Sequence, residues 1–194
     1  MALLSAGHVV ELREIKLGNK PQEFLAASAS ATVPTLQTGA TTLDESLHIM
    51  TWALTRNDPE NLLDMPEQAW HLIDRNDGPF KAALDHTKYA VRYPELDPLQ
   101  ERAKAADVIL DLDHRLQQHG FLMGARATLA DLAIVPFVRQ FALIDRSWFD
   151  AQPWPNVLCW LDHFLQSARF HQAMVKVPLW SPQSSPIYFG PLAE

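Results

Sequence analysis

Apolar residues recur at helical spacing through the last two thirds of the chain. This spacing places apolar side chains on one face of a helix, where they can pack against a neighbour. The clearest stripe, at positions i, i+3, i+4 and i+7, is formed by Val157, Trp160, Leu161 and Phe164. The same pattern predicts helices over residues 66–75, 79–91, 98–119, 128–144 and 155–167.

The first third has a different, mixed pattern. Val10 and Leu12 alternate with charged residues, as in a half-buried strand, and Gly39 separates two strand-like runs, as in a β-hairpin. In chain order, the pattern predicts the end of a helix, a strand, a short irregular helix, two hairpin strands and a longer helix, over residues 1–6, 9–15, 20–29, 34–37, 41–43 and from about 45 onward. This part is therefore expected to be α/β.

The change of pattern falls near Asp58-Pro59, which has the form of a helix N-cap followed by proline at the first helical position. We therefore expect two domains, an α/β domain over residues 1–55 and an all-helical domain over residues 59–194. The tail from Pro178 is rich in proline and serine, and irregular chain is expected there.

Composition narrows the classes of function. The formal net charge is -7, and no cluster of Lys and Arg reverses it locally, so we expect no nucleic-acid partner. No segment is long and apolar enough to predict a membrane span, and the N-terminus lacks the pattern of a signal peptide. A single cysteine, Cys159, cannot form an internal disulfide. These features predict a cytoplasmic protein.

The most informative stretch is KPQEFLAASASATVPTLQTGATTLDES, residues 20–46. It combines a Val-Pro pair before a strand, a hairpin, and a Glu-Ser pair at the start of a helix. Each pair alone is common, since Val-Pro often opens a strand and Asp-Glu-Ser is ordinary helix capping. In this order, the stretch resembles the N-terminal domain of glutathione transferases, most closely the omega-like and related bacterial kinds.

The resemblance implies a glutathione-binding site. A cis bond between Val33 and Pro34 would turn the Val33 backbone outward, to pair with the cysteinyl peptide of glutathione. Glu45 and Ser46 would hold the γ-glutamyl group, where the N-terminus of the helix suits its carboxylate. Lys20 would lie near the glycyl end. Glutathione would act as co-substrate, with a small electrophile or disulfide as the second substrate.

The helical half supports the same resemblance. Thr128 and Asp131 have the spacing of a capping box before an apolar helix. The stretches KYAVRYPE, AIVPFVRQF and PNVLCWLDHFLQS also look like bacterial members of the family. The implied fold is a thioredoxin-like N-terminal domain followed by an all-α helical-bundle domain, and the implied assembly is a homodimer. Residues that would face the second substrate are Phe80, Lys81, Leu84, Lys88, Tyr89 and Arg92.

The chain departs from the family pattern at two places. The residues before Val33 lack the usual proline and glycine of this loop. In addition, residues 1–7 match only the end of the family's first helix, so the first strand and the catalytic loop are expected to be absent. We assign no catalytic residue and no metal site, because Cys159 is expected to be a small packed side chain in a helix.

Two functions remain open from the sequence. The first is an enzyme that catalyses glutathione-dependent conjugation or thiol transfer. The second is a non-catalytic binding or scaffolding protein of the same fold, which would agree with the departure at the N-terminus. The departure at the N-terminus would also be explained if Met1 were an internal methionine of a longer product.

Overall fold

The computed structural model describes residues 1–39 and 41–191, which form two compact units. The first unit comprises Met1–Leu63 together with the chain from His171 onward, and the second comprises Asp64–Phe170. The tail, which the sequence pattern assigned to the helical domain, therefore belongs to the first unit. The junction at residues 63 and 64 lies slightly beyond the boundary expected at residues 55–58.

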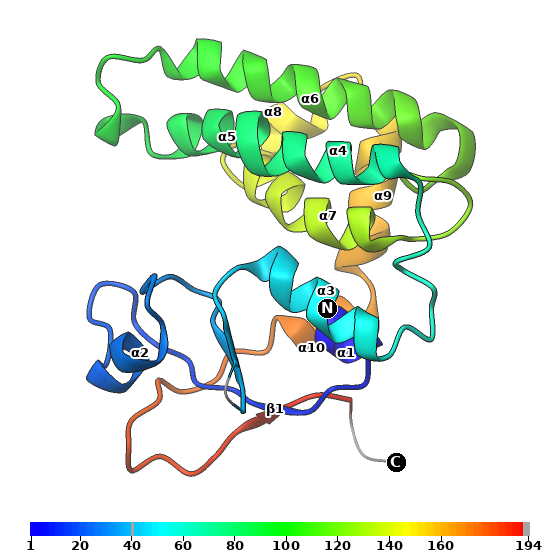
Figure 1. Cartoon of the computed structure of the whole chain (residues 1–194). Coiled ribbons are helices and arrows are strands. Elements are labelled where there is room, and N and C mark those ends of the chain that lie inside the picture. Colours follow the sequence, from blue (N-terminus) through cyan, green and yellow to red (C-terminus); the bar gives the residue numbers. More distant parts are fainter. Residues whose placement is uncertain (40, 192–194) are drawn as a thin grey trace. The chain divides into compact units, whose positions relative to one another are not determined.

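The first unit has short helices and two small sheets (Figure 1). Its elements are α1 (Ala2–Ser5), β1 (Val10–Glu11), α2 (Gln22–Ala27), β2 (Leu36–Thr38), β3 (Thr41–Leu43), α3 (Ser46–Arg56) and β4 (Tyr188–Phe189), and α10 (Ala168–Ala173) spans the junction with the second unit. Helices α1 and α3 pack together, and the Asn57 amide donates to the Ala6 carbonyl at 3.0 Å. Gly7, with φ of +71°, follows α1 in the left-handed conformation that commonly ends a helix.

The tail pairs with the predicted first strand. β4 runs antiparallel to β1, the Leu12 N–H donates to the Ile187 carbonyl at 2.7 Å, and the Trp180 N–H donates to the Glu14 carbonyl at 2.8 Å. The Arg13 guanidinium lies 4.7 Å from the centre of the Trp180 ring. The tail therefore satisfies backbone groups along one edge of β1, which explains why it is ordered as a strand there.

Strands β2 and β3 form the predicted hairpin as a separate two-stranded sheet. Gly39 has φ of +60° in the turn, a conformation that glycine adopts without strain. Asp58 does not cap a helix, contrary to the sequence prediction. Its carboxylate instead accepts hydrogen bonds at 2.8 Å from the N–H groups of Leu62 and Leu63 in a turn.

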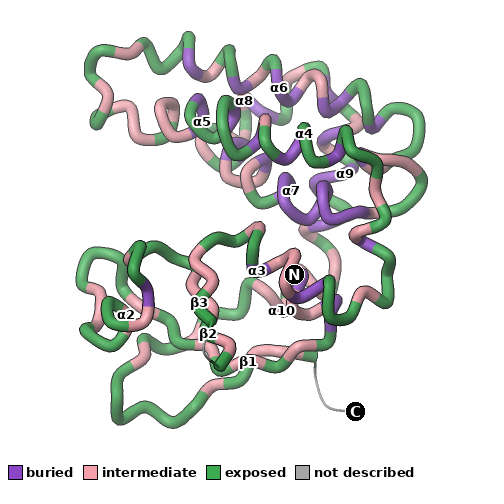
Figure 2. The backbone as a smooth tube through the Cα atoms, in the orientation of Figure 1, coloured by how far each residue is buried: buried purple, intermediate pink, exposed green. Residues whose placement is uncertain are grey.

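The second unit is helical. Its elements are α4 (Glu67–Arg75), the π-helical turn η1 (Asn76–Phe80), α5 (Lys81–Lys88), the 3-10 turn η2 (Ala90–Arg92), α6 (Pro98–His119), α7 (Leu129–Ala142), α8 (Arg146–Asp150) and α9 (Pro155–Leu165). Buried residues concentrate on α7, which forms the centre of this unit (Figure 2). α6 has the predicted bounds because both ends are signalled locally: Asp97 caps it, and Gly120 closes it in the left-handed conformation.

The start of α7 is held by a buried carboxylate. Thr128 and Asp131 form the predicted capping box, in which Asp131 accepts from the Thr128 N–H at 2.8 Å. The same carboxylate accepts from the Leu122 N–H at 3.0 Å and from the Trp160 indole at 2.9 Å. Burial raises the pKa of Asp131, and these hydrogen bonds oppose the effect.

Candidate functional site

The peptide bond between Val33 and Pro34 is cis, as the family resemblance implied. Val33 is 44% exposed. Within residues 1–39 and 41–191, its backbone N–H and C=O have no hydrogen-bond partner. An exposed backbone segment with a free donor and a free acceptor can pair with an extended peptide as an added strand. Val33 therefore has the backbone properties needed to bind a short peptide.

The second part of the candidate site is the start of α3. Glu45 is extended, with φ of −118° and ψ of 141°, and Ser46 is the first helical residue. Both are exposed. No described side chain caps this helix, so the N–H groups of its first turn remain available to an acidic group. The Ser46 hydroxyl and the Glu45 carboxylate add a donor and an anionic acceptor at the same place.

Lys20 contacts the loop that precedes the cis bond. Its ammonium donates to the Ala31 carbonyl at 2.8 Å, and Ala31 has φ of +53°, which is unusual for a residue other than glycine. This contact supports the loop from the side of α2. The loop lacks the family's glycine, and Ala31 adopts a left-handed conformation in its place.

Asp44 connects the two parts, and the sequence interpretation missed it. Its Oδ1 atom accepts from the Ser28 hydroxyl at 3.0 Å and from the Thr35 hydroxyl at 3.1 Å. Hydrogen bonding by Ser30, Ser28 and Thr35 lowers the pKa of Asp44, so it is an anion at neutral pH. The available signal was the run of hydroxyl residues before Val33, together with an aspartate directly before the Glu-Ser pair.

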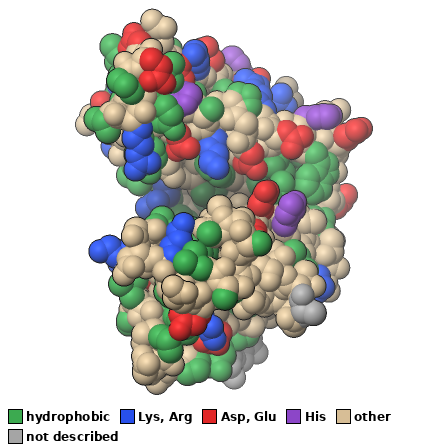
Figure 3. Space-filling view, turned by 60° about the vertical axis from the view of Figure 1, so that its left-hand side comes forward, with side chains coloured by type: hydrophobic (Ala, Val, Ile, Leu, Met, Phe, Trp, Pro, Cys, Tyr) green, Lys and Arg blue, Asp and Glu red, His purple; other side chains and the backbone are tan. Residues whose placement is uncertain are grey.

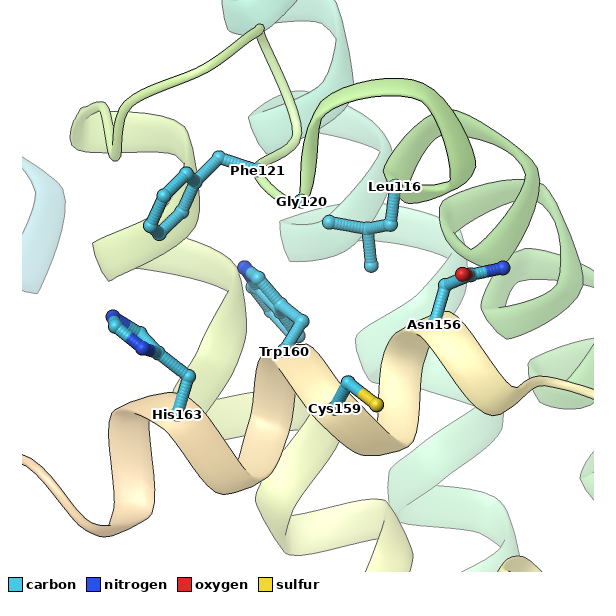
Figure 4. Close-up of a pocket in the computed structure, with 7 residues that line it drawn as sticks. All are labelled: Leu116, Gly120, Phe121, Asn156, Cys159, Trp160 and His163. Carbon is cyan, nitrogen blue, oxygen red and sulfur yellow. The ribbon is translucent and has the colours of Figure 1, made fainter.

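Cys159 is exposed, so the expectation of a packed side chain was wrong. It lies on α9 with Asn156, Trp160 and His163 at the edge of a hollow of about 300 Å³ in the helical unit (Figure 4). Leu116, Gly120 and Phe121 form the other side of this hollow. No interaction of the thiol with a base is seen among the described residues, so this hollow supplies no activated nucleophile.

Two of the residues expected to face the second substrate are in the core of the helical unit. Phe80 is 0% exposed and Leu84 is 1% exposed. Lys88 and Arg92 instead reach the surface, where both lie over the Tyr89 ring at 4.8 Å and 4.4 Å. The apolar members of the predicted set therefore stabilise the unit, and its polar members remain accessible.

Metal, membrane and nucleic-acid binding each require features of their own. In the part of the chain that the structure describes, no group of three or more His, Cys, Asp or Glu side chains is arranged to hold a metal ion. No helix among the described residues is long and apolar enough to cross a bilayer. On the face shown in Figure 3, acidic and basic side chains alternate over the helical unit and do not gather into one basic surface.

Two family models match the chain. The model for the glutathione S-transferase N-terminal domain matches residues 1–61, and the model for the glutathione S-transferase C-terminal domain matches residues 82–163. Each match lies within one compact unit. Comparison with curated protein sequences gives no match.

Solved glutathione transferases have similar structures. A delta-class enzyme of Nilaparvata lugens is 25% identical, with 79% of this chain and 73% of that chain covered and a TM-score of 0.59. The bacterial glutathione transferase BphK is 17% identical, with 89% and 90% covered and a TM-score of 0.75. Glutathione S-transferase-I bound with lactoylglutathione is 24% identical, with 88% of each chain covered and a TM-score of 0.69.

The omega-like subtype suggested by the sequence remains a prediction. The fold is the expected one, a thioredoxin-like N-terminal half followed by a helical half. The two family models together span most of the chain, and both describe the same family, so the chain belongs to the glutathione S-transferase superfamily.

Proposed function

We propose that this chain binds glutathione through Val33, Pro34, Glu45 and Ser46, with Lys20 near the glycyl end. The observation that carries the proposal is Val33, a residue 44% exposed whose backbone N–H and C=O have no hydrogen-bond partner among the described residues. The cysteinyl peptide of glutathione has a backbone N–H and C=O that can pair with those of Val33. Membership of the superfamily supports the same ligand.

Each group of the tripeptide has a partner of matching chemistry in this proposal. The cysteinyl peptide pairs with the Val33 backbone as a short added strand. The γ-glutamyl carboxylate lies at the uncapped start of α3, where the helix dipole and the Ser46 hydroxyl stabilise it. The α-ammonium donates to Glu45. These contacts orient the ligand so that its thiol remains free.

The activity we propose is glutathione-dependent conjugation or thiol transfer. In conjugation, the glutathione sulfur forms a bond to the electrophilic carbon, the leaving group departs with its electron pair, and the thiol proton passes to solvent. The proposed residues bind and orient glutathione, and none of them is a nucleophile. The second substrate is a small electrophile or disulfide, and the proposed setting is a cytoplasmic homodimer.

Calorimetry with glutathione tests the binding step. We expect Ser46→Ala and Glu45→Ala each to weaken binding about tenfold, because each removes a hydrogen bond to a charged group. Ser147→Ala and Glu67→Ala are matched controls on exposed positions of α8 and α4, and they should leave the affinity unchanged. Absence of binding by the parent chain at millimolar glutathione would refute the proposal.

A turnover assay separates the enzyme from the binding protein. Conjugation of glutathione to a reactive aryl halide above the uncatalysed rate would support the enzyme. Binding without such turnover, and without exchange of a mixed disulfide, would instead support the non-catalytic alternative.

A further inference from the structure

The segment from Ser28 to Thr35, here called the hydroxyl loop, is held mainly by side chains. It lies between α2 and β2 and contains the cis bond. The Ser28 hydroxyl contacts that of Ser30 at 3.2 Å, and the Ser30 hydroxyl contacts that of Thr32 at 2.7 Å. The Thr35 hydroxyl lies 2.8 Å from the Thr32 carbonyl and 3.1 Å from the Asp44 carboxylate, so these two acceptors share its one proton. A loop with few backbone hydrogen bonds depends on such contacts for its shape.

Asp44 is the acceptor on which these hydrogen bonds converge. Its carboxylate accepts from Ser28 and Thr35, which are the first and last residues of the hydroxyl loop. Its backbone carbonyl accepts from the Thr32 hydroxyl at 3.5 Å. Hydrogen bonds to an ionised acceptor are stronger than those between neutral groups. One anion therefore fixes both ends of the loop that carries Val33 and Pro34.

Asp44 is also next to the second part of the candidate site in the sequence. Asp44 directly precedes Glu45 and Ser46, so its backbone is continuous with the start of α3. Lys20 gives the loop a further contact, because its ammonium donates to the Ala31 carbonyl. The two parts flank the β2–β3 hairpin, whose terminal pair is Leu36 and Leu43, and the Asp44 side chain adds a direct link between them.

We propose that Asp44 is a positioning residue that holds the Val33–Pro34 segment in register with Glu45 and Ser46, so that the glutathione site is formed before the ligand arrives. This inference rests on the proposed function. Binding to a site that is already formed costs less free energy, because the loop does not have to be ordered by the ligand. The role of Asp44 is indirect, since its carboxylate contacts the loop and is not assigned to the ligand.

Asp44→Ala tests the proposal by two measurements. Hydrogen exchange at the hydrogen-bonded amides of Ser28, Ala31 and Thr32 is expected to be about tenfold faster, and the glutathione affinity measured by calorimetry is expected to fall about tenfold. Asp44→Asn should give smaller changes in both, because its amide oxygen can still accept from Ser28 and Thr35. This partial rescue distinguishes positioning of the loop from a general loss of stability.

Asp58→Ala is the matched control. Asp58 also accepts two hydrogen bonds in the first unit, but from Leu62 and Leu63 and not from the hydroxyl loop. Its removal should lower the melting temperature without changing exchange at residues 28–35 or the glutathione affinity. If Asp44→Ala does not fold, the pair Ser28→Ala and Thr35→Val removes the donors and should produce the same two changes.

Unchanged exchange in the hydroxyl loop of Asp44→Ala would overturn the inference, as would an equal loss of affinity in Asp58→Ala. Failure of the parent chain to bind glutathione would overturn the proposed function. The exchange measurement does not use glutathione, so it decides the role of Asp44 in holding the loop in either case.

Discussion

The Trp160 indole N–H donates a 2.9 Å hydrogen bond to the Asp131 carboxylate, and both side chains are buried in the helical unit. This bond joins the start of α7 to the middle of α9. Because the same carboxylate also binds the N–H groups of Leu122 and Thr128, it links segments that are distant in sequence.

We expect Asp131→Ala to lower the free energy of unfolding by about 3 kcal/mol or more, since each buried donor left without a partner costs about 1–3 kcal/mol. Thr128→Ala removes the cap together with the hydroxyl that donates to Asp131, and should cost about 0.5–2 kcal/mol. Trp160→Phe should fall between them. Urea denaturation measures all three variants, and an unchanged unfolding free energy in Asp131→Ala would show that the carboxylate does not support the fold.

The lowered pKa of Glu101 predicts that the free energy of unfolding depends on pH. It is 5% exposed, and hydrogen bonds with Lys104 and then His86 lower its pKa from the usual 4.5. On acidification the unfolded chain takes up this proton first, so the stabilisation is present above pH 4.5 and is lost as the pH falls through the lowered pKa.

Glu101→Gln should therefore melt at a lower temperature at neutral pH and show a weaker loss of stability below pH 4.5 than the parent. Asp107→Asn changes an exposed residue of the same helix and serves as the control. Parallel profiles of melting temperature against pH for Glu101→Gln and the parent would contradict the assignment.

Gly190 permits the tail to lie against β1. A Cβ atom at this position would be 2.8 Å from the Val9 Cγ2 atom and 2.9 Å from the Val9 Cα atom. Gly190→Ala should push the tail away, lower the melting temperature and speed hydrogen exchange of the Leu12 amide, which bonds to Ile187. Gly18→Ala, where a Cβ would meet nothing within 4 Å, is the control. Equal melting temperatures for the two variants would disprove the close approach.

The proposed homodimer predicts a species of twice 21.9 kDa in sedimentation velocity at micromolar concentration. The candidate contact residues for this dimer are the apolar residues of α3 and Trp70. Ile49 and Leu54 are buried within the first unit, whereas Trp70 is 36% exposed on α4. Trp70→Glu should weaken the dimer, while His71→Glu on the neighbouring exposed position should not. A single 21.9 kDa species for the parent would exclude the dimer at that concentration.

The long helices could be predicted from the sequence because their signals are local. Apolar spacing, Asp97 with Pro98, and Gly120 determine α6 within one segment, and the same holds for Thr128 and Asp131 at the start of α7. The cis Val33–Pro34 bond and the Glu45–Ser46 helix start could also be inferred, since both belong to one short motif. The short helices α8 and α10 have too few residues to show a periodic pattern, and the sequence reading missed both.

Tertiary structure decided the features that join distant segments. Asp58 has the sequence of a helix cap but binds Leu62 and Leu63 in a turn, and the tail that looked irregular forms β4 on β1. Asp44 looked like part of ordinary capping, yet its carboxylate holds the loop of Val33. A capping carboxylate or an exposed strand edge can accept several partners of equal chemistry. Only the packed chain determines which donor comes within hydrogen-bond distance, because that choice depends on segments far apart in the sequence.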